Sequence, residues 1–165
     1  MNYSELEAEI LELVIGADEG RIRAFGEETV TRLVRPERLR YAGEEELTQA
    51  AWAALTTARE NVLTISAAEL GGALATIYDG ILADDDLDAG IIAVIGALAH
   101  WHSYLKQNRR GELYELAIRS IEDVDEEISA DLDDFLATPE MAAEYERIRR
   151  LLGPESSQEQ RTRSA

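Results

Sequence analysis

Two histidines, His100 and His102, are the only imidazole side chains in the 165-residue chain, and their closeness raises the question of a metal or acid–base site. Residues two positions apart on one helix point about 200° from each other, so these two side chains cannot chelate one ion. Di-iron helical bundles require a glutamate three residues before a histidine, and those positions hold Ala97 and Ala99. The histidines therefore predict neither a zinc site nor a ferritin-like enzyme.

The acidic run from Asp84 to Asp88 has the D-D-x-x-D spacing with which isoprenoid synthases bind magnesium diphosphate. Those enzymes also need a larger helical cavity and a second metal motif, which this sequence lacks. Carboxylates are favourable at a helix N-terminus in any case, because they interact with the helix dipole. We interpret the run as the start of a helix and predict no metal ligands in it.

Acidic pairs at E-x-x-E or E-x-x-D spacing are typical of helical nucleotide pyrophosphohydrolases, which hold magnesium with them. This chain offers three such pairs: Glu9 with Glu12, Glu112 with Glu115, and Glu122 with Asp125. Because 34 of the 165 residues are acidic, such pairs arise by chance, and only their convergence on one pocket would give them meaning. A small magnesium-dependent hydrolase stays open as the alternative function. The main prediction has no catalytic residue, no metal and no cofactor.

Negative charge is concentrated between Glu112 and Asp134, where ten carboxylates face Arg119 alone and give a net charge of −9, half of the −18 of the whole chain. Acids repeat four residues apart there, as at Glu122 and Glu126, and each such pair costs a helix about 0.2–0.5 kcal/mol. A solvated face kept for solubility is one explanation. A surface for a cationic partner explains better why no lysine relieves the repulsion. The expected partner-binding residues are Glu122, Asp123, Glu126, Glu127 and Asp131.

The composition limits the other possible partners. A net charge of −18 repels polyanions, so we expect no nucleic acid and no anionic membrane as a partner. The chain has no cysteine, which excludes disulfides and fits a reducing compartment. The first ten residues lack the basic and apolar regions of a signal peptide, and the longest apolar run, Ala89 to Ala99, is too short to span a membrane. We expect a cytoplasmic protein.

The fold expected from periodicity is an all-α, single-domain bundle of six to seven helices around a central apolar helix at about 85–106. Apolar residues recur in that helix at three- and four-residue steps, namely Leu87, Ile91, Val94, Ile95, Leu98, Trp101 and Leu105. Its other faces are apolar or small, so it needs neighbours on several sides. The preceding helix carries Gly71, Gly72 and Gly80, which predict close helix crossings.

Capping signals place the other helices. Ser4 with Glu7 predicts the first helix start, Asp18 the second, and Ser66 with Glu69 the fourth. A third helix is expected directly after Gly43, opening on three glutamates. A long helix from Glu112 to about Asp134 carries the stripe Tyr114, Ala117, Ile121, Val124 and Ile128, and Thr138 with Pro139 opens a last helix with the stripe Met141, Tyr145, Ile148 and Leu151.

The domain prediction is one helical domain over residues 1–153 and a disordered C-terminal tail over residues 154–165, since Gly153 and Pro154 stop the last helix. A homodimer is possible in sequence terms, because Trp52 and the glycine-bearing helices could face a second copy. Oligomeric state stays open at this point.

Three segments, AWAAL at Ala51–Leu55, DDDLDAGIIAVIGALAH at Asp84–His100 and ELYELAIRSIEDVDEEI at Glu112–Ile128, are similar to small all-helical bacterial proteins of unassigned function, some of which are immunity proteins of polymorphic toxin systems. The resemblance is one of pattern and covers roughly residues 45–134. It implies an all-α fold and a binding role, that of an acidic immunity or inhibitor protein that occludes a basic toxin. It carries over no site residues.

Overall fold

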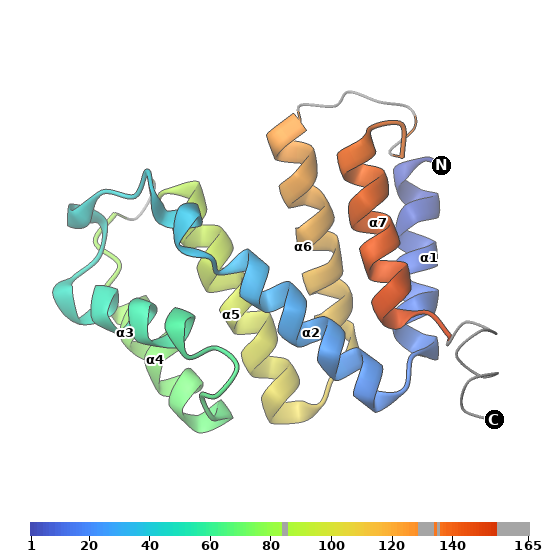
Figure 1. Cartoon of the computed structure of the whole chain (residues 1–165). Coiled ribbons are helices and arrows are strands. Elements are labelled where there is room, and N and C mark those ends of the chain that lie inside the picture. Colours follow the sequence, from blue (N-terminus) through green and yellow to red (C-terminus); the bar gives the residue numbers. More distant parts are fainter. Residues whose placement is uncertain (84–85, 129–133, 135, 155–165) are drawn as a thin grey trace. The chain divides into compact units, whose positions relative to one another are not determined.

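The structure is a computed structural model that describes residues 1–83, 86–128, 134 and 136–154, without the side chains of residues 125–128. The helices are α1 (Tyr3–Gly16), α2 (Glu19–Leu33), η1 (Pro36–Leu39), η2 (Glu44–Glu46), α3 (Gln49–Glu60), α4 (Ala67–Asp79), α5 (Ala89–Gln107), α6 (Arg110–Ile128) and α7 (Pro139–Leu152), where η denotes a 3₁₀ helix (Figure 1). The predicted all-α class is confirmed. The only β pairing in the described part is an isolated bridge between Leu47 and Ile81.

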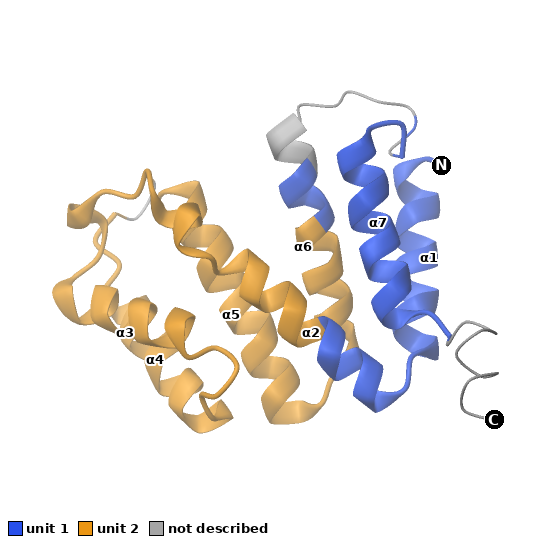
Figure 2. Ribbon diagram, viewed as in Figure 1, with its two compact units in different colours: residues 1–25, 121–165 blue, residues 26–120 orange. Residues whose placement is uncertain are grey.

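The chain forms two compact units (Figure 2). Unit 1 comprises residues 1–25 and 121–165, and unit 2 comprises residues 26–120. The boundaries fall inside α2 and α6, so each of these helices contributes residues to both units. The predicted tail after residue 154 lies outside the described residues. None of the described helices combines the length and the apolarity that crossing a membrane would need.

Unit 1 is built on the packing of α1 against α7. The buried apolar side chains of these two helices are Leu6, Ile10, Val14, Met141, Tyr145, Ile148 and Leu152. Thr138 and Pro139 open α7 as predicted, and the Thr138 hydroxyl accepts the backbone N–H of Met141 at 3.4 Å. In the last turn Leu152, rather than Leu151, is buried.

The predicted cap of α1 is wrong by two residues. Asn2, not Ser4, is the N-cap: its side chain accepts the backbone N–H of Glu5, and the Glu5 carboxylate accepts the N–H of Asn2. Asn is at least as good a cap as Ser, and a glutamate stands three residues after each, so spacing alone cannot choose between them. The Asp18 cap of α2 is confirmed, since its carboxylate accepts the N–H of Arg21 at 2.8 Å.

Unit 2 contains α5, which packs against α4, η1 and α3, while α3 and α4 pack closely on each other. The predicted start of the central helix near residue 85 is wrong: α5 begins at Ala89, because the Asp88 carboxylate caps it by accepting the N–H groups of Gly90 and Ile91. The buried residues of α5 are Ile91, Val94, Ile95, Ala97, Leu98, Trp101 and Tyr104.

Two details of α5 differ from the expected pattern. Tyr104 is buried in the last turn, whereas Leu105 is only half-buried. Ile92 is 53% exposed, so α5 is not enclosed on every side as its composition suggested. At the centre of the unit the Trp101 ring is fully buried, and its indole N–H donates to the backbone carbonyl of Val62 at 3.1 Å.

Helix α3 begins five residues later than predicted. Glu44–Glu46 forms the short helix η2, Leu47 is extended, and Thr48 caps α3 by accepting the N–H of Ala51. The extended residues pair with the segment after α4: Thr48 N–H donates to Gly80 and Leu82 N–H donates to Glu46. This pairing also ends α4 at Asp79, although the apolar stripe was expected to continue through Leu82, which is 61% exposed.

The glycines of α4 have different environments. A Cβ at Gly71 would lie 2.9 Å from Nε2 of His102 on α5, and a Cβ at Gly80 would overlap Ala51 and Thr48. These two glycines therefore do permit close approach of neighbouring segments, as predicted. Gly72 is exposed and a Cβ there would meet nothing within 4 Å, so the prediction is wrong for this residue.

Helix α6 begins at Arg110, and its predicted end near Asp134 falls among residues that are partly outside the described range. The expected stripe is wrong in register at its start: Leu113, Leu116 and Ala117 are fully buried, while Tyr114 is half-buried. Ser120 and Ile121 continue the buried stripe. These positions follow the i, i+3, i+4, i+7, i+8 pattern of a helix with one wide apolar face.

The exposed carboxylate of Asp134 makes the stability of unit 1 depend on pH in the acidic range. The backbone N–H of Leu136, first, and then the amino group of Met1 at 3.2 Å hold the pKa of Asp134 below its ordinary value of 3.8. Because the folded state lowers this pKa, the group stabilises unit 1 above pH 3.8 and loses that contribution as the pH falls through the lowered value. We expect the Asp134 carboxyl carbon to titrate below 3.8 by NMR. A midpoint at or above that value would contradict both contacts.

Candidate functional site

Four of the five predicted partner-binding residues, Glu122, Asp123, Glu126 and Glu127, lie at the C-terminal end of α6, in unit 1. Glu122 is exposed, and its carboxylate accepts a long hydrogen bond of 3.4 Å from the Tyr3 hydroxyl. Asp123 is half-buried and interacts with other residues of the chain. The side chains of Glu126 and Glu127, and all of Asp131, lie outside the described residues. The structure therefore makes Glu122 accessible and leaves the joint surface of the five acids a prediction.

Charge is divided unequally between the units. Unit 1 holds 19 acidic and seven basic residues, a net charge of −12, and unit 2 holds 15 acidic and nine basic residues, a net charge of −6. Two thirds of the net charge thus belongs to 70 of the 165 residues. The sequence pattern placed the excess of acids on one helix. In the structure, the C-terminal end of that helix belongs to the same unit as α1, which carries further acids.

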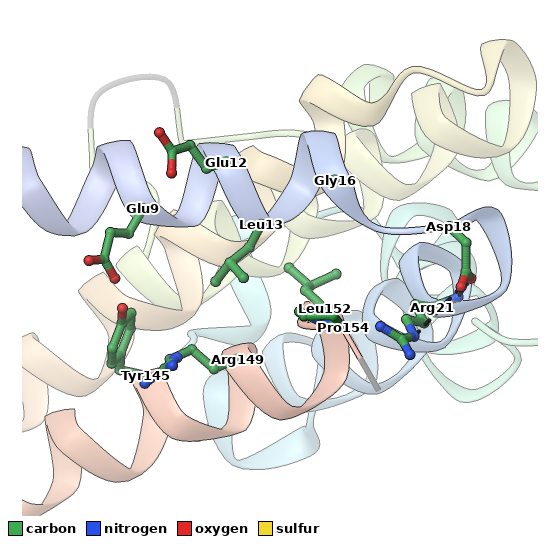
Figure 3. A pocket seen from close by; sticks show the side chains of 10 residues that line it. All are labelled: Glu9, Glu12, Leu13, Gly16, Asp18, Arg21, Tyr145, Arg149, Leu152 and Pro154. Carbon is green, nitrogen blue, oxygen red and sulfur yellow. Dashed lines mark hydrogen bonds and ion pairs between the residues drawn. The ribbon is translucent and has the colours of Figure 1, made fainter. Parts of the chain in front are cut away.

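Helix α1 contributes two of these acids to a groove of about 790 Å³ in unit 1 (Figure 3). Glu9 and Glu12 come from one side of the groove together with Leu13, and Tyr145, Arg149 and Leu152 come from α7 on the other side. Gly16, Asp18, Arg21 and Pro154 complete the lining. Both glutamates are exposed, and neither forms a hydrogen bond or ion pair with any described residue. Sequence reasoning considered this pair only as magnesium ligands.

The histidines are explained by contacts inside unit 2. His100 Nδ1 lies 2.6 Å from Oε2 of Glu112, so the first turn of α6 is linked to α5. His102 lies against Gly71 of α4. The two imidazoles thus meet different helices, in keeping with their divergence on α5. Glu112 and Glu115 belong to unit 2 and Glu9 and Glu12 to unit 1. No group of three or more acids or histidines within the described ranges is arranged to hold a metal ion.

The acidic run before α5 marks the start of the helix, as interpreted from the sequence, but a single residue of the run caps it. Asp88 is the N-cap, and its own N–H donates to Oε1 of Glu46 at 2.7 Å. Asp86 is exposed, and Asp84 and Asp85 lie outside the described residues. Glu46 therefore joins η2 to the start of α5, a role that no local pattern suggested because the two residues are 42 positions apart.

A second residue that sequence reasoning missed is Glu144, a carboxylate 4% exposed in the middle of α7. Arg147 binds it through Nε at 3.1–3.2 Å and through a terminal nitrogen at 2.7 Å, while the guanidinium carbon lies 5.8 Å from the centre of the Phe25 ring. A signal was present: Glu144 follows Met141 by three and precedes Ile148 by four residues, which puts it on the apolar stripe.

A smaller pocket of about 500 Å³ in unit 2 is lined by Ala42, Glu44, Leu47, Gln49 and Trp52. The indole N–H of Trp52 donates to the carbonyl of Glu44 at 3.0 Å, so this ring is fixed within its own chain. Trp52 was considered as a possible dimer contact, and that suggestion stays a prediction.

Comparison with known protein families, with curated proteins and with solved structures finds no match for this chain.

Proposed function

We propose that this chain is a non-enzymatic acidic binding protein, an immunity or inhibitor protein that occludes a basic surface of a partner such as a toxin. The observation that carries the proposal is the excess of negative charge in unit 1, with 19 acidic against seven basic residues. Charge of one sign gathered on one part of a protein steers oppositely charged partners toward it and raises the association rate.

Local features of unit 1 support the same role. Glu122 is accessible on α6, and Glu9 and Glu12 are exposed on α1 without partners among the described residues. Like charges at i, i+4 positions of α6, such as Glu122 and Glu126, destabilise the free helix and would be relieved by a cationic surface.

The alternative, a magnesium-dependent hydrolase, needs carboxylates grouped around an ion. Of its candidate ligands, Glu112 is hydrogen-bonded to His100, and Glu9 and Glu12 belong to a different unit from Glu112. No contact within the described ranges favours this function over binding.

The test is charge reversal on α6. A partner is first isolated from the native host, or taken as the product of a neighbouring toxin gene, and binding to the purified partner is then measured by calorimetry. Glu122→Lys/Glu126→Lys should weaken binding roughly ten-fold at 0.01 M salt, where the Debye length is about 30 Å, and much less at 0.15 M, where it is about 8 Å. The variant should melt no lower than the wild type, because the lysine pair repels itself no more than the glutamate pair does and each lysine gains an acidic residue three positions away.

The matched control is Glu69→Lys/Asp79→Lys on α4, which makes the same change of net charge at two exposed positions of unit 2. This control should keep the wild-type affinity within about two-fold. Equal losses in the two variants would mean that only net charge matters. An α6 variant that binds a specific partner as tightly as wild type at low salt would refute the proposed surface.

A further inference from the structure

The groove of unit 1 has an uncompensated negative charge. Arg21 is held by the carbonyl of Gly153 and lies 3.6 Å from the Asp18 carboxylate. Arg149 lies 3.5 Å from Glu146. Each groove arginine thus has an acidic neighbour, and Asp18 is further engaged in capping α2. Glu9 and Glu12 remain without a cation among the described residues, so the groove as a whole attracts positive charge.

The walls of the groove suit a flat, partly apolar cation. Leu13 from α1 and Leu152 from α7 point toward each other, and the Tyr145 ring stands beside Glu9, with its hydroxyl toward the Glu9 carboxylate (Figure 3). The guanidinium of Arg149 already lies 5.7 Å from the centre of the Tyr145 ring. This contact shows that a guanidinium can lie over the ring in this groove.

We propose that the groove receives an arginine side chain from a protein partner, with Glu9 as the carboxylate that binds its guanidinium. A guanidinium matches a carboxylate through two parallel N–H donors, and the methylene stem of arginine can cover the two leucines. Glu12 points away from α7 and lies at the rim, so it contributes long-range attraction rather than a direct contact (Figure 3). The inference rests on the proposed function in that the basic partner supplies the arginine.

Arginine suits this groove better than the other candidates for an occupant. Lysine presents a compact, strongly hydrated ammonium that cannot pair with a carboxylate through two parallel bonds. An anion would meet the two free carboxylates of α1 before it reached Arg21, whose guanidinium is already bound to the chain. A purely apolar segment would leave Glu9 desolvated and unpaired, which is unfavourable.

The test uses the full-length protein and a small probe. N-acetyl-arginine amide is titrated into ¹⁵N-labelled protein, and N-acetyl-citrulline amide serves as its neutral isostere. We expect the arginine probe to shift the amide signals of α1 and α7 around the groove with weak, saturable affinity, and the citrulline probe to shift them much less. Glu9→Gln should weaken binding roughly five-fold, and Glu12→Gln should have a smaller effect.

The matched control is Glu140→Gln, which removes one exposed carboxylate of unit 1 that does not line the groove. It should leave the probe affinity unchanged. Equal effects of Glu9→Gln and Glu140→Gln, or equal binding of arginine and citrulline probes, would overturn the proposal. The chain also carries Arg161 and Arg163 after the groove residue Pro154. If Arg161→Gln/Arg163→Gln tightens probe binding, the occupant is the chain itself and not a partner.

The result of the probe titration can be distinguished from the result of the test of the proposed function. Probe binding that depends on Glu9, in a protein for which no basic partner exists, would keep Glu9 as a guanidinium-binding carboxylate but refute both the binding function and a partner as the source of the arginine. A partner whose binding depends on the α6 acids but is not weakened by Glu9→Gln would keep the binding function and refute the groove assignment.

Discussion

Glu144→Ala is expected to lower the free energy of unfolding by about 3–5 kcal/mol, because it removes the carboxylate that pairs with Arg147 at 2.7 Å in a buried site. Arg147 is 11% exposed and Glu144 3% exposed at their side chains, so water cannot replace the lost partner of either residue. Urea denaturation followed by circular dichroism measures this change directly. The m-value should stay constant if the native state keeps its compactness.

The control for the buried pair is an exposed ion pair two residues further along the same helix. Glu146 and Arg149 form an ion pair at 3.5 Å with side chains 69% and 56% exposed. Glu146→Ala should therefore change stability by less than about 1 kcal/mol. Glu144→Leu/Arg147→Met should be far less destabilising than the sum of the two single substitutions to alanine, because it removes both charges of the pair together and fills the site with apolar side chains. Additive losses would show that the two residues are not coupled.

Gly90→Ala is expected to destabilise unit 2 by about 3 kcal/mol or more. A Cβ at Gly90 would overlap the backbone carbonyl oxygen of Arg38 in η1 and lie 2.8 Å from the carboxylate of Asp88. The first of these is backbone and cannot rotate away, and the second is the cap of α5. The substitution should therefore separate η1 from α5 or break the cap. Thermal and urea unfolding measure the loss.

The matched control is Gly72→Ala in α4, also in unit 2. A Cβ there meets nothing within 4 Å, so the substitution should stabilise the protein by up to about 1 kcal/mol through helix propensity. Opposite signs for the same chemical change would confirm the close approach of η1 to α5. A Gly90→Ala protein within about 0.5 kcal/mol of wild type would contradict it.

Local signals in the sequence predicted several helix boundaries that residues within one turn decide. The Asp18 and Thr138 caps and the stop at Gly153 were predicted because a cap needs only residues within one turn. The buried residues of α5 from Ile91 to Trp101 also followed from periodicity. The start of α3 was wrong because a distant segment intervenes: α3 begins at Gln49 because Leu47 and Thr48 pair with the chain after α4. The cap of α1 was wrong because two equivalent local signals, at Asn2 and at Ser4, compete.

The same distinction applies to the candidate site. The accumulation of acid on α6 is a property of the sequence, and the i, i+4 repulsion that it causes is determined by helix geometry alone. The tertiary structure determines which of these acids have a partner. Glu112 looked like its neighbours in the sequence but is bound to His100 on another helix, whereas Glu9 and Glu12 have no partner in the described part of the chain.

The sequence by itself therefore determined an all-α protein with strong negative charge, most helix boundaries to within a few residues and the apolar face of α5. Only the tertiary structure decided the division into two units, the burial of Glu144 with Arg147 and the groove between α1 and α7. The physical reason is the range of the interactions. Caps and periodicity act within one or two turns, whereas a groove or a buried ion pair exists only once segments distant in sequence have been packed together.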